Sequence, residues 1–465
     1  MNSQPRAGLL PLYLKLYDDC MPERRAQFEP FLKSAADTLS SAGMEVVPAP
    51  VCRLETEFND AVRAFERADV DAIITLHLAY SPSLESIAAL AGTELPIVIL
   101  DTTMDLAFGR DVSPDRIMYN HGVHGVMDMA NVLLRHGKKF EIAAGHLSDP
   151  GVAGAAAGLV RAARAAKLLR QTRALRIGAS FHGMGDFAVD ESVLRDVLGI
   201  DVVQAQPRDL APFVEAVGRD EIDDELARDR SRFDCRLDEG VHARSVAVGL
   251  GLRRMLAERS CDAFSMNFLA FDDSAGPVNT VPFLEASKAM ERGIGYAGEG
   301  DVLTAALVGA LARGFGTPAT FTEIFCPDWQ GGSVFLSHMG EINPATASGK
   351  PLVVEKPFPY TAAENPAVLT CAMQPGPAVF VNLAPGPNDT FSLIAAPVTV
   401  LEDAADEKMK NSVRGWIKPQ CALTDFLERY SLLGGTHHSA LILGVSTEAV
   451  AAFARFAGLA CHIIR

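Results

Sequence analysis

Hydrophobic residues in the first third of the chain fall into short continuous runs that are separated by amphipathic segments. The continuous runs cover residues 7–16, 44–51, 70–80 and 95–103, and the amphipathic segments cover 23–43, 57–68 and 83–92. A strand that is apolar throughout has both faces buried, and helices between such strands cover a parallel sheet. This pattern predicts a doubly wound α/β domain.

A second unit of the same kind follows an alanine-rich helix that we expect at about residues 151–172. The run LRIGASFHGMGDF, which begins at residue 175, restarts the pattern with a strand and a glycine-rich loop, so we place a boundary after residue 173. Further strands (DVVQAQ and CDAFSMNFLAF) and helices continue to residue 316. The sequence therefore predicts two Rossmann- or flavodoxin-like parallel-sheet domains, at residues 1–173 and 174–316.

The pattern changes after residue 316, where Pro, Gly and Thr become frequent and the apolar runs become short. These runs are TFTEIF, SVFLSHM, PLVVEKPF, AVFVNLA and FSLIAAPVTVL. Short strands at close spacing, with turn residues between them, are typical of a β-barrel or a β-sandwich. We therefore predict a β-rich, barrel-like C-terminal domain over residues 317–465.

Composition and charge exclude some classes of partner. The 465 residues carry a formal net charge of −16 without any basic run, so we expect no nucleic-acid partner. No stretch reaches the ~18 consecutive apolar residues of a membrane span, and the N-terminal segment lacks a signal-peptide pattern. None of the eight cysteines forms a CxxC pair, which argues against a structural zinc ribbon. Scattered cysteines of this kind are typical of a protein with reduced thiols. We expect a cytoplasmic protein without a membrane partner.

Three separated stretches carry residues that suit chemistry at a metal ion. Glu299 lies between two glycines at the start of an expected helix. Glu323 and His338 lie in two strands that flank a turn at 327–332, so a hairpin brings them roughly opposite each other. The adjacent His437 and His438 follow a flexible Gly-Gly-Thr. Two carboxylates with two imidazoles suit a divalent ion of the manganese type that keeps positions open for water or substrate oxygens.

The same residues also have structural interpretations. A carboxylate at residue 299 would be favoured by the helix dipole alone, and Glu323 with His338 could form a buried pair or face solvent. His121 and His124, in YNHGVHGVMD, share a face if they lie in the first turn of a helix. Either of these two histidines could begin a helix or contact a substrate.

Three motifs, GYAGEGDVLTAAL, FTEIF…LSHMGEINP and GGTHHSAL, occur in this order and resemble the L-arabinose isomerase and L-fucose isomerase superfamily, the L-arabinose isomerase branch most closely. The resemblance implies a metal-dependent aldose–ketose isomerase of an open-chain monosaccharide. It also implies a homo-oligomer, a hexamer or a trimer, whose active sites are shared between subunits. The implied metal ion is Mn²⁺, with Co²⁺ or Mg²⁺ as alternatives.

The resemblance also implies roles for individual residues. The implied Mn²⁺ ligands are Glu299, Glu323, His338 and His438, with the two glutamates as the acid/base pair of a cis-enediol mechanism. The implied sugar contacts are Met184 in FHGMGDFAV, Phe271 in NFLAFDD, His437, and His121 and His124 in the segment that reaches a neighbouring subunit's site. Motif position favours His438 over His437 as the ligand, and which glutamate acts on carbon stays open.

Several departures from the family pattern concern the sugar rather than the metal. His121 stands where the branch has a substrate-contacting glutamine, the N-terminal loop lacks the usual Gln-rich stretch, and the third domain is shorter. The sugar can therefore differ from L-arabinose, and an anionic sugar would need a cation such as Lys15, Lys356 or Arg414. A non-catalytic sugar-binding or regulatory protein and a metal-dependent hydrolase are the alternatives outside this chemistry.

Overall fold

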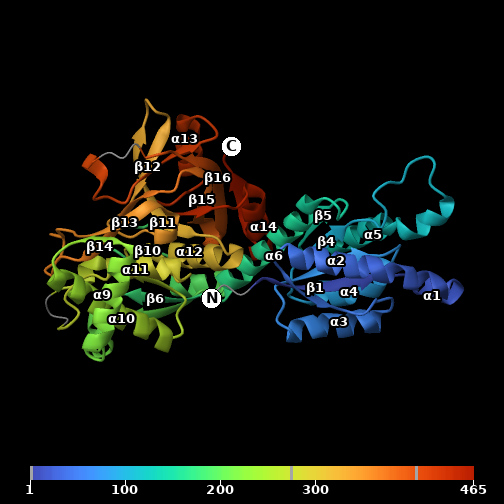
Figure 1. Cartoon of the computed structure of the whole chain (residues 1–465), viewed down its shortest axis with the longest axis horizontal. Helices are drawn as coiled ribbons and strands as arrows, with labels where there is room; N and C mark the ends of the chain where they lie inside the picture. The colour runs from blue at the N-terminus through green and yellow to red at the C-terminus, as the bar shows by residue number, and fades with distance from the viewer. Residues whose placement is uncertain (1–3, 273–275, 404–406) are drawn as a thin grey trace. The chain divides into compact units, whose positions relative to one another are not determined.

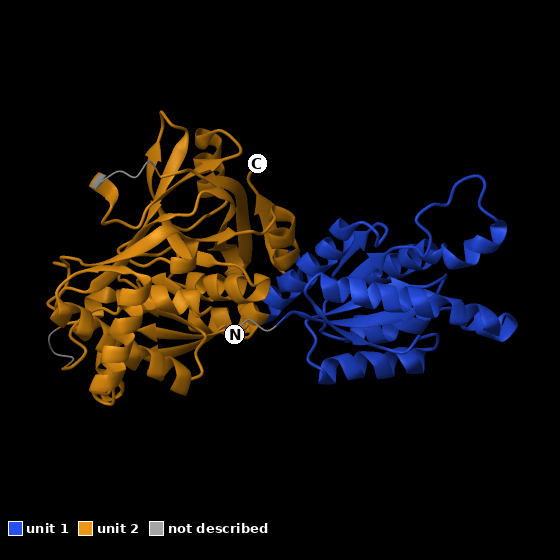
Figure 2. Cartoon of the chain, in the orientation of Figure 1, with its two compact units in different colours: residues 1–167, 455–457 blue, residues 168–454, 458–465 orange. Residues whose placement is uncertain are grey.

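The computed structural model describes residues 4–272, 276–403 and 407–465, which form two compact units (Figures 1 and 2). Unit 1 contains the described residues up to Lys167 together with Arg455–Ala457. Unit 2 contains the described residues of Leu168–Ala454 and Gly458–Arg465. Within the described residues, no helix is both long enough and apolar enough to span a membrane.

Unit 1 is a five-stranded parallel sheet with helices on both faces. The strands are β1 (Arg6–Leu12), β2 (Glu45–Pro48), β3 (Ala72–His77), β4 (Ile97–Asp101) and β5 (Phe140–Ala144). Their order, β2-β1-β3-β4-β5, is the flavodoxin-like order of doubly wound folds. The continuously apolar strands have buried side chains on both faces, as β3 illustrates, so the predicted parallel sheet is confirmed.

Two apolar clusters, one on each face of this sheet, hold the helices of unit 1. Helices α2 (Glu29–Ser41) and α6 (Pro150–Arg170) contribute to one cluster. Helices α3 (Glu55–Arg67), α4 (Ser83–Gly92) and α5 (Gly122–Arg135) contribute to the other. The single helix expected at 23–43 is instead a 3-10 helix, η1 (Pro22–Phe28), followed by α2, which ends before Gly43 and its φ of 86°. The short α1 (Lys15–Cys20) precedes both.

Unit 2 begins with a second parallel sheet, of four strands in the order β10-β9-β6-β7. These strands are β6 (Arg173–Ile177), β7 (Asp201–Ala205), β9 (Ala263–Met266) and β10 (Gly295–Gly298). The helices between and after them are α7 (Glu191–Val193), α8 (Ala211–Glu215), α9 (Arg219–Arg232), α10 (Glu239–Glu258), α11 (Phe283–Glu291) and α12 (Val302–Phe315). The two glycines Gly295 and Gly309 let β10 and α12 approach closely, because a Cβ on Gly295 would meet the backbone of α12.

A closed antiparallel β-barrel of six strands completes unit 2 (Figure 1). Its strands are β11 (Ala319–Asp328), β12 (Ser333–Ser337), β15 (Gly376–Pro385), β16 (Phe391–Val400), β17 (Gly415–Pro419) and β18 (His438–Leu443). The order is β15-β18-β11-β12-β17-β16, and pairing of β16 with β15 closes the ring. The last strand, β19 (Ala460–Ile463), lies parallel to β16. The predicted fold class, two parallel-sheet layers followed by a barrel, is confirmed.

A three-stranded sheet joins segments from both sides of residue 316. It pairs β8 (Asp234–Arg236) with β13 (Ala347–Glu355), which in turn pairs with β14 (Ala367–Met373). Helices α13 (Leu423–Leu432) and α14 (Thr447–Ala457) lie between barrel strands and near the chain end. The division into domains 1–173, 174–316 and 317–465 stays a prediction.

Candidate metal centre

The turn between β10 and α12 presents Glu299, and its GEG sequence has a steric explanation. Glu299 has φ 64° and Gly300 φ 86°, both in the left-handed region that costs a residue with a side chain about 1 kcal/mol. A Cβ on Gly300 would lie 2.6 Å from Cα of Ser180, and a Cβ on Gly298 would lie 2.7 Å from Cε1 of His338. The two glycines therefore leave room for a neighbouring loop and for an imidazole, while Glu299 is held in the bend between them.

Three neighbouring barrel strands bring the other expected ligands together. Glu323 in β11 pairs with His438, the first residue of β18, on one side and with Ser337 of β12 on the other. His338 follows β12 directly, one residue beyond the position opposite Glu323. The predicted hairpin is present, with a register one residue away from the expected one.

The ligand atoms of five residues converge. Those of Glu299, His437 and His438 lie within 4.8 Å of one another, and so do those of Glu323, His338 and His438. Oε2 of Glu299 lies 3.5 Å from Nε2 of His438, and Oε2 of Glu323 lies 4.0 Å from Nε2 of His338. His438 belongs to both groups and therefore lies at the centre of the cluster.

The far nitrogens of His338 and His438 are held by buried carboxylates. Nδ1 of His438 donates to Oδ2 of Asp301 at 3.0 Å, and Nδ1 of His338 donates to Oε2 of Glu341 at 2.9 Å. Tyr296 donates in turn to Oε1 of Glu341 at 2.7 Å. Such carboxylate–histidine pairs fix the ring and leave Nε2 as the coordinating atom. Nε2 of His438 is buried without a hydrogen-bond partner, which fits a site built to hold a metal ion.

Electrostatics separate the two glutamates. Burial alone would raise the pKa of Glu299, but contacts with His437 and His438 hold this pKa well below its ordinary value. Burial raises the pKa of Glu323, and the neighbouring histidines only partly oppose this rise. The cluster therefore contains one strongly stabilised carboxylate and one carboxylate that binds a proton more readily.

His437 has a different environment from His438. Its backbone N–H and its ring Nδ1 both donate to Oδ2 of Asp186, at 2.9 and 2.6 Å. Burial alone would lower the pKa of His437, but the hydrogen bond to Asp186 and the nearby carboxylate of Glu299 raise it to about 10. The side chain of His437 is 31 % exposed, whereas that of His438 is fully buried.

Aromatic rings surround the cluster on its protein side. Phe187 stacks on His438 with 4.9 Å between ring centroids, and Phe321 meets both His438 and His338 edge-on. Both phenylalanine rings are buried. Apolar walls of this kind lower the local dielectric and strengthen the electrostatic interactions of the polar atoms they enclose.

The remaining predicted sugar contacts are more dispersed. Met184 lies in the loop after β6, two residues before Asp186, and is partly buried. Phe271 is fully buried after the 3-10 helix η5 (Phe268–Ala270), and Thr361 donates to its backbone carbonyl. The last residue of its motif, Asp273, lies outside the described residues.

His121 and His124 lie at the start of α5 in unit 1, with 5.8 Å between their ring centroids. The two histidines do share one end of a helix, and Nε2 of His121 is 3.1 Å from the hydroxyl of Tyr17. Of the candidate cations, Lys15 pairs with Asp19 and Arg414 with Asp403. Lys356 donates to the backbone carbonyl of Met339, next to His338.

Sequence reasoning did not identify the residues that hold the histidines. Asp301 and Glu341 lie within the quoted motifs, two residues after Glu299 and three after His338, so this spacing could have pointed to them. Asp186 also lies within a quoted motif, two residues after Met184, but its partner His437 is 251 residues away.

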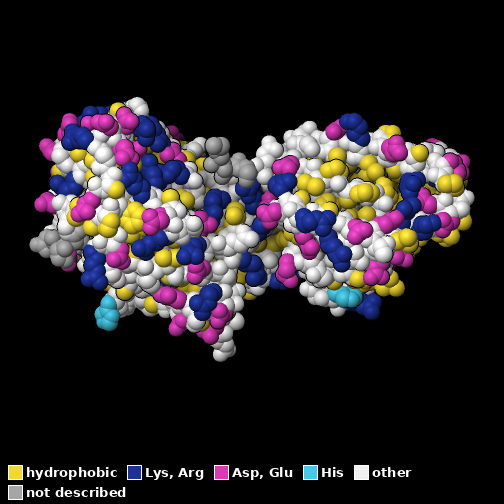
Figure 3. Space-filling view, turned by 90° about the horizontal axis from the view of Figure 1, so that it is seen from below, with side chains coloured by type: hydrophobic (Ala, Val, Ile, Leu, Met, Phe, Trp, Pro, Cys, Tyr) yellow, Lys and Arg dark blue, Asp and Glu magenta, His cyan; other side chains and the backbone are white. Residues whose placement is uncertain are grey.

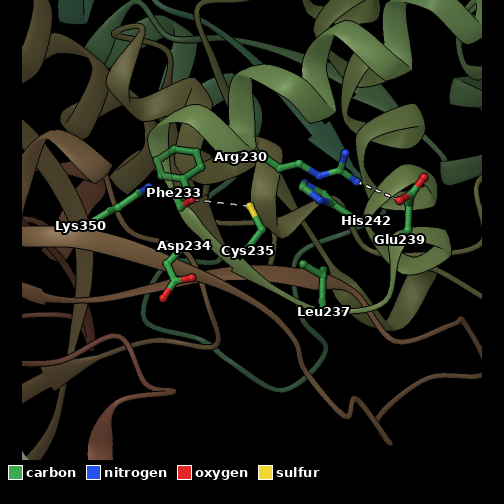
Figure 4. Close-up of a pocket in the computed structure, with 8 residues that line it drawn as sticks. All are labelled: Arg230, Phe233, Asp234, Cys235, Leu237, Glu239, His242 and Lys350. Atoms are coloured by element: carbon green, nitrogen blue, oxygen red, sulfur yellow. Dashed lines mark hydrogen bonds and ion pairs between the residues drawn. The ribbon is translucent and has the colours of Figure 1, made fainter.

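One cavity of unit 2, of approximately 340 Å³, lies away from these residues (Figure 4). The residues that line it are Arg230, Phe233, Asp234, Cys235, Leu237, Glu239, His242 and Lys350. Its Arg230 and Glu239 form an ion pair at 3.1 Å. None of the expected ligands or sugar contacts lines this cavity.

Comparison with known proteins gives two family models that match the chain. The model described as the L-arabinose isomerase central domain matches residues 184–313, and the model described as the L-arabinose isomerase C-terminal domain matches residues 318–460. The L-arabinose isomerase of Acidothermus cellulolyticus is 27% identical over 93% of this chain and 88% of its own length. That of Geobacillus kaustophilus is 27% identical over 84% of this chain and 80% of its own length.

A solved periplasmic solute-binding protein from Actinobacillus succinogenes 130z, with bound D-allose, is 15% identical and covers 67% of this chain and 92% of its own chain. Its TM-score of 0.17 is too low to support an argument about this fold. The two family models, in contrast, follow each other along more than half of the chain and include every residue of the cluster. The chain belongs to the L-arabinose isomerase family.

Proposed function

We propose that this protein is a metal-dependent aldose–ketose isomerase that converts an open-chain monosaccharide through a cis-enediol. The observation that carries the proposal is the buried, unpartnered Nε2 of His438, which lies among Glu299, Glu323 and His338. These four residues would hold the metal ion, and Mn²⁺ suits their two carboxylates and two imidazoles best, with Co²⁺ or Mg²⁺ as alternatives.

Isomerisation moves a proton between C2 and C1 and a second proton between O1 and O2. Glu299 and Glu323 supply two carboxylates at the cluster, so one can act on carbon and the other on oxygen. A bound divalent ion would supply electrostatic stabilisation of the charge that develops on the enediol oxygens. Phe187 and Phe321 pack against the ring of His438 and exclude water from that side of it.

The sugar need not be the one in the relatives' name. His121 stands where the branch has a glutamine, and the ammonium of Lys356 donates to the carbonyl that follows His338. A second candidate substrate is therefore an aldose that carries an anionic group, because Lys356 is a cation next to the cluster and has further donors. Met184, Phe271, His121, His124 and His437 are the proposed sugar contacts.

The remaining parts of the proposal concern assembly and location. We propose a homo-oligomer, a hexamer or trimer, in which the segment with His121 and His124 completes a neighbouring subunit's site. None of the eight cysteines, all of which lie in the described residues, forms a disulfide, which supports a reducing compartment such as the cytoplasm. On the face that Figure 3 shows, Lys and Arg side chains are interspersed with Asp and Glu.

The test is a panel of neutral aldoses and aldoses with an anionic group, incubated with metal-stripped and Mn²⁺-reconstituted protein. Ketose formation that appears only after reconstitution is the expected result. Sugar binding that is independent of metal and without turnover would favour a sugar-binding protein. Metal-dependent hydrolysis without ketose would favour a hydrolase.

A further inference from the structure

Two adjacent histidines have the same side-chain chemistry, so their surroundings must decide what each one does. His438 opens strand β18 and is fully buried, whereas His437 lies just before the strand and keeps 31 % of its side chain exposed. Their ring centroids are only 4.3 Å apart. Both Nε2 atoms approach Oε2 of Glu299, at 3.7 Å from His437 and 3.5 Å from His438.

Asp301 commits His438 to one orientation. Its Oδ2 accepts the Nδ1–H of His438, while its Oδ1 accepts the N–H of Thr304 at the start of α12. The neutral imidazole then has a lone pair on Nε2, and this buried atom makes no hydrogen bond, although Oε2 of Glu299 lies 3.5 Å away. That is the arrangement of a metal ligand with its supporting carboxylate.

Asp186 holds His437 in a different way. One carboxylate oxygen accepts both the backbone N–H and the ring Nδ1–H, which fixes the ring relative to its own main chain. The ring is partly exposed, so its Nε2 can reach a ligand on the open side of the cluster as well as Glu299. A ring held in this way is a hydrogen-bond donor to an oxygen when it carries the Nε2 proton.

The carboxylates that bond His437 and His438, Asp186 and Asp301, lie in two different loops of unit 2. Asp186 lies in the loop between β6 and α7, and the next residue, Phe187, stacks on His438 at an interplanar angle of 7°. Asp186 therefore forms a hydrogen bond with His437, and the next residue, Phe187, stacks on His438. Asp301 belongs to the turn after β10, beside Glu299.

We propose that Asp186 is a positioning residue that holds His437 as a hydrogen-bond donor to a sugar oxygen, while Asp301 holds the neighbouring His438 as a metal ligand. The assignment to the sugar rests on the proposed isomerase function. The assignment of the two carboxylates to different histidines is tested without any sugar.

The first experiment measures Mn²⁺ affinity of the metal-stripped full-length protein by calorimetry. Asp301→Asn should weaken Mn²⁺ binding about 10- to 100-fold, the usual loss when the partner of a ligating histidine is changed. Asp186→Ala, at a side chain that is 38 % exposed, should leave the affinity unchanged. Asp301→Asn keeps an oxygen that can still cap α12, so this variant retains that structural contact. Equal weakening in both variants would overturn the proposal, because His437 would then be a ligand.

The second experiment follows the ring nitrogens of His437 by NMR in wild type, Asp186→Ala and, for assignment, His437→Gln. A hydrogen-bonded Nδ1–H of His437 should be present in wild type and lost in Asp186→Ala, which removes the oxygen that accepts it, while the signals of His438 stay in place. Absence of this signal in wild type, or its survival in Asp186→Ala, would overturn the positioning role. This result does not depend on finding the substrate.

The third experiment uses turnover of a sugar that the panel identifies. Asp186→Ala should lower kcat in the wild-type background and should have no further effect in the His437→Gln background, because both changes remove one interaction. An equal loss in both backgrounds would show that Asp186 acts on the fold rather than through His437. If no sugar is converted, the isomerase function fails, whereas the Mn²⁺ and NMR results still decide the roles of the two carboxylates.

Discussion

Gly298 shows how a residue without a side chain shapes the cluster. His338 occupies the space that a Cβ at residue 298 would need, with Cε1 at 2.7 Å and Nε2 at 3.1 Å from the ideal Cβ position. The ring cannot move away easily, because Nδ1 is bonded to the buried Glu341. The glycine is therefore part of the geometry that brings Nε2 of His338 toward Glu323.

We predict that Gly298→Ala weakens Mn²⁺ binding by at least about 10-fold, because the methyl group displaces the imidazole from its carboxylate partner. Titration of the metal-stripped protein measures this effect. Gly154→Ala is the control, since a Cβ on that exposed glycine of α6 meets nothing within 4 Å. Unchanged affinity in Gly298→Ala would contradict the proposed site.

The two carboxylates give a second prediction at this scale. Glu299→Gln and Glu323→Gln should each lower kcat about 10²- to 10⁴-fold, because an amide can neither accept nor return the transferred proton. The measurement is steady-state turnover with saturating Mn²⁺, with the exposed Glu428→Gln as the control. A variant with a near wild-type rate would remove that glutamate from the acid/base pair.

The sequence was sufficient to identify the convergent residues but not their supports. Glu299, Glu323, His338 and His438 stand out because polar residues beside glycines or turns in apolar surroundings need a reason to be there. Asp186 lies two residues after Met184 in an expected motif, but its contact with His437 spans 251 positions, and no local pattern encodes that contact. Phe271 lies in an expected motif, yet its ring is completely buried.

At the scale of elements, helices α9, α10 and α11 are joined by buried ion pairs rather than by apolar contacts alone. Lys288 of α11 lies 2.7 Å from Glu225 and 2.9 Å from Asp229, both on α9. Arg253 of α10 bonds both Glu225 and Glu285, at 2.9 Å each. Breaking one buried partner of such a network is strongly destabilising.

This network predicts a pH dependence of stability. Burial alone would raise the pKa of Glu225, but Lys288 and Arg253 lower it from 4.5 to about 2. Because the folded pKa lies below the ordinary value, the ionised carboxylate stabilises the fold above pH 4.5, and this contribution is lost as the pH falls toward 2. The stability difference between wild type and Glu225→Gln should therefore shrink over this range.

Denaturation followed by tryptophan fluorescence measures this difference, because both tryptophans of the chain, Trp329 and Trp416, belong to unit 2. Glu258→Gln, at the exposed end of α10, is the matched control and should show little difference from wild type at any of these pH values. A constant gap between wild type and Glu225→Gln from pH 5 to pH 2 would contradict the proposed ionic stabilisation.

Periodicity identified most strands and helices of both parallel sheets, but it was less successful where pairing is non-local. The β11–β12 register differs by one residue from the expected one because the ladder shifts between Ile324 and Cys326. Strands β14 and β17 and helix α13 were not predicted. The charged segment at 208–230 forms η4 (Pro207–Leu210), α8 and α9, with a break at residues 216–218 before α9.

At the scale of the whole molecule, the barrel was predicted from short strands, but its strand order was not. The order β15-β18-β11-β12-β17-β16 depends on contacts between segments more than one hundred residues apart, such as Glu323 with His438. The pairing of β8 with β13 likewise joins segments that were assigned to different domains. Local patterns give the elements, whereas burial of their apolar faces decides which ones meet.

Metal binding should be visible as stability of unit 2, because the expected ligands come from the parallel sheet and the barrel together. Mn²⁺ at about 100 times its Kd should stabilise the folded state by about 2.7 kcal/mol. Thermal unfolding monitored by tryptophan fluorescence, with and without EDTA, measures this shift. The shift should disappear in His438→Ala, and an equal shift in that variant would mean that Mn²⁺ binds elsewhere.

The closed barrel also bears on how such proteins diversify. Glu323, His338 and His438 lie on or directly after three strands whose ladders continue around a ring without free edges. In such a ring, no strand can slip without disturbing all the others. Mutations that reshape surface loops can thus alter substrate choice while descendants inherit an unchanged reaction centre, so new sugars become accessible without reinventing the chemistry.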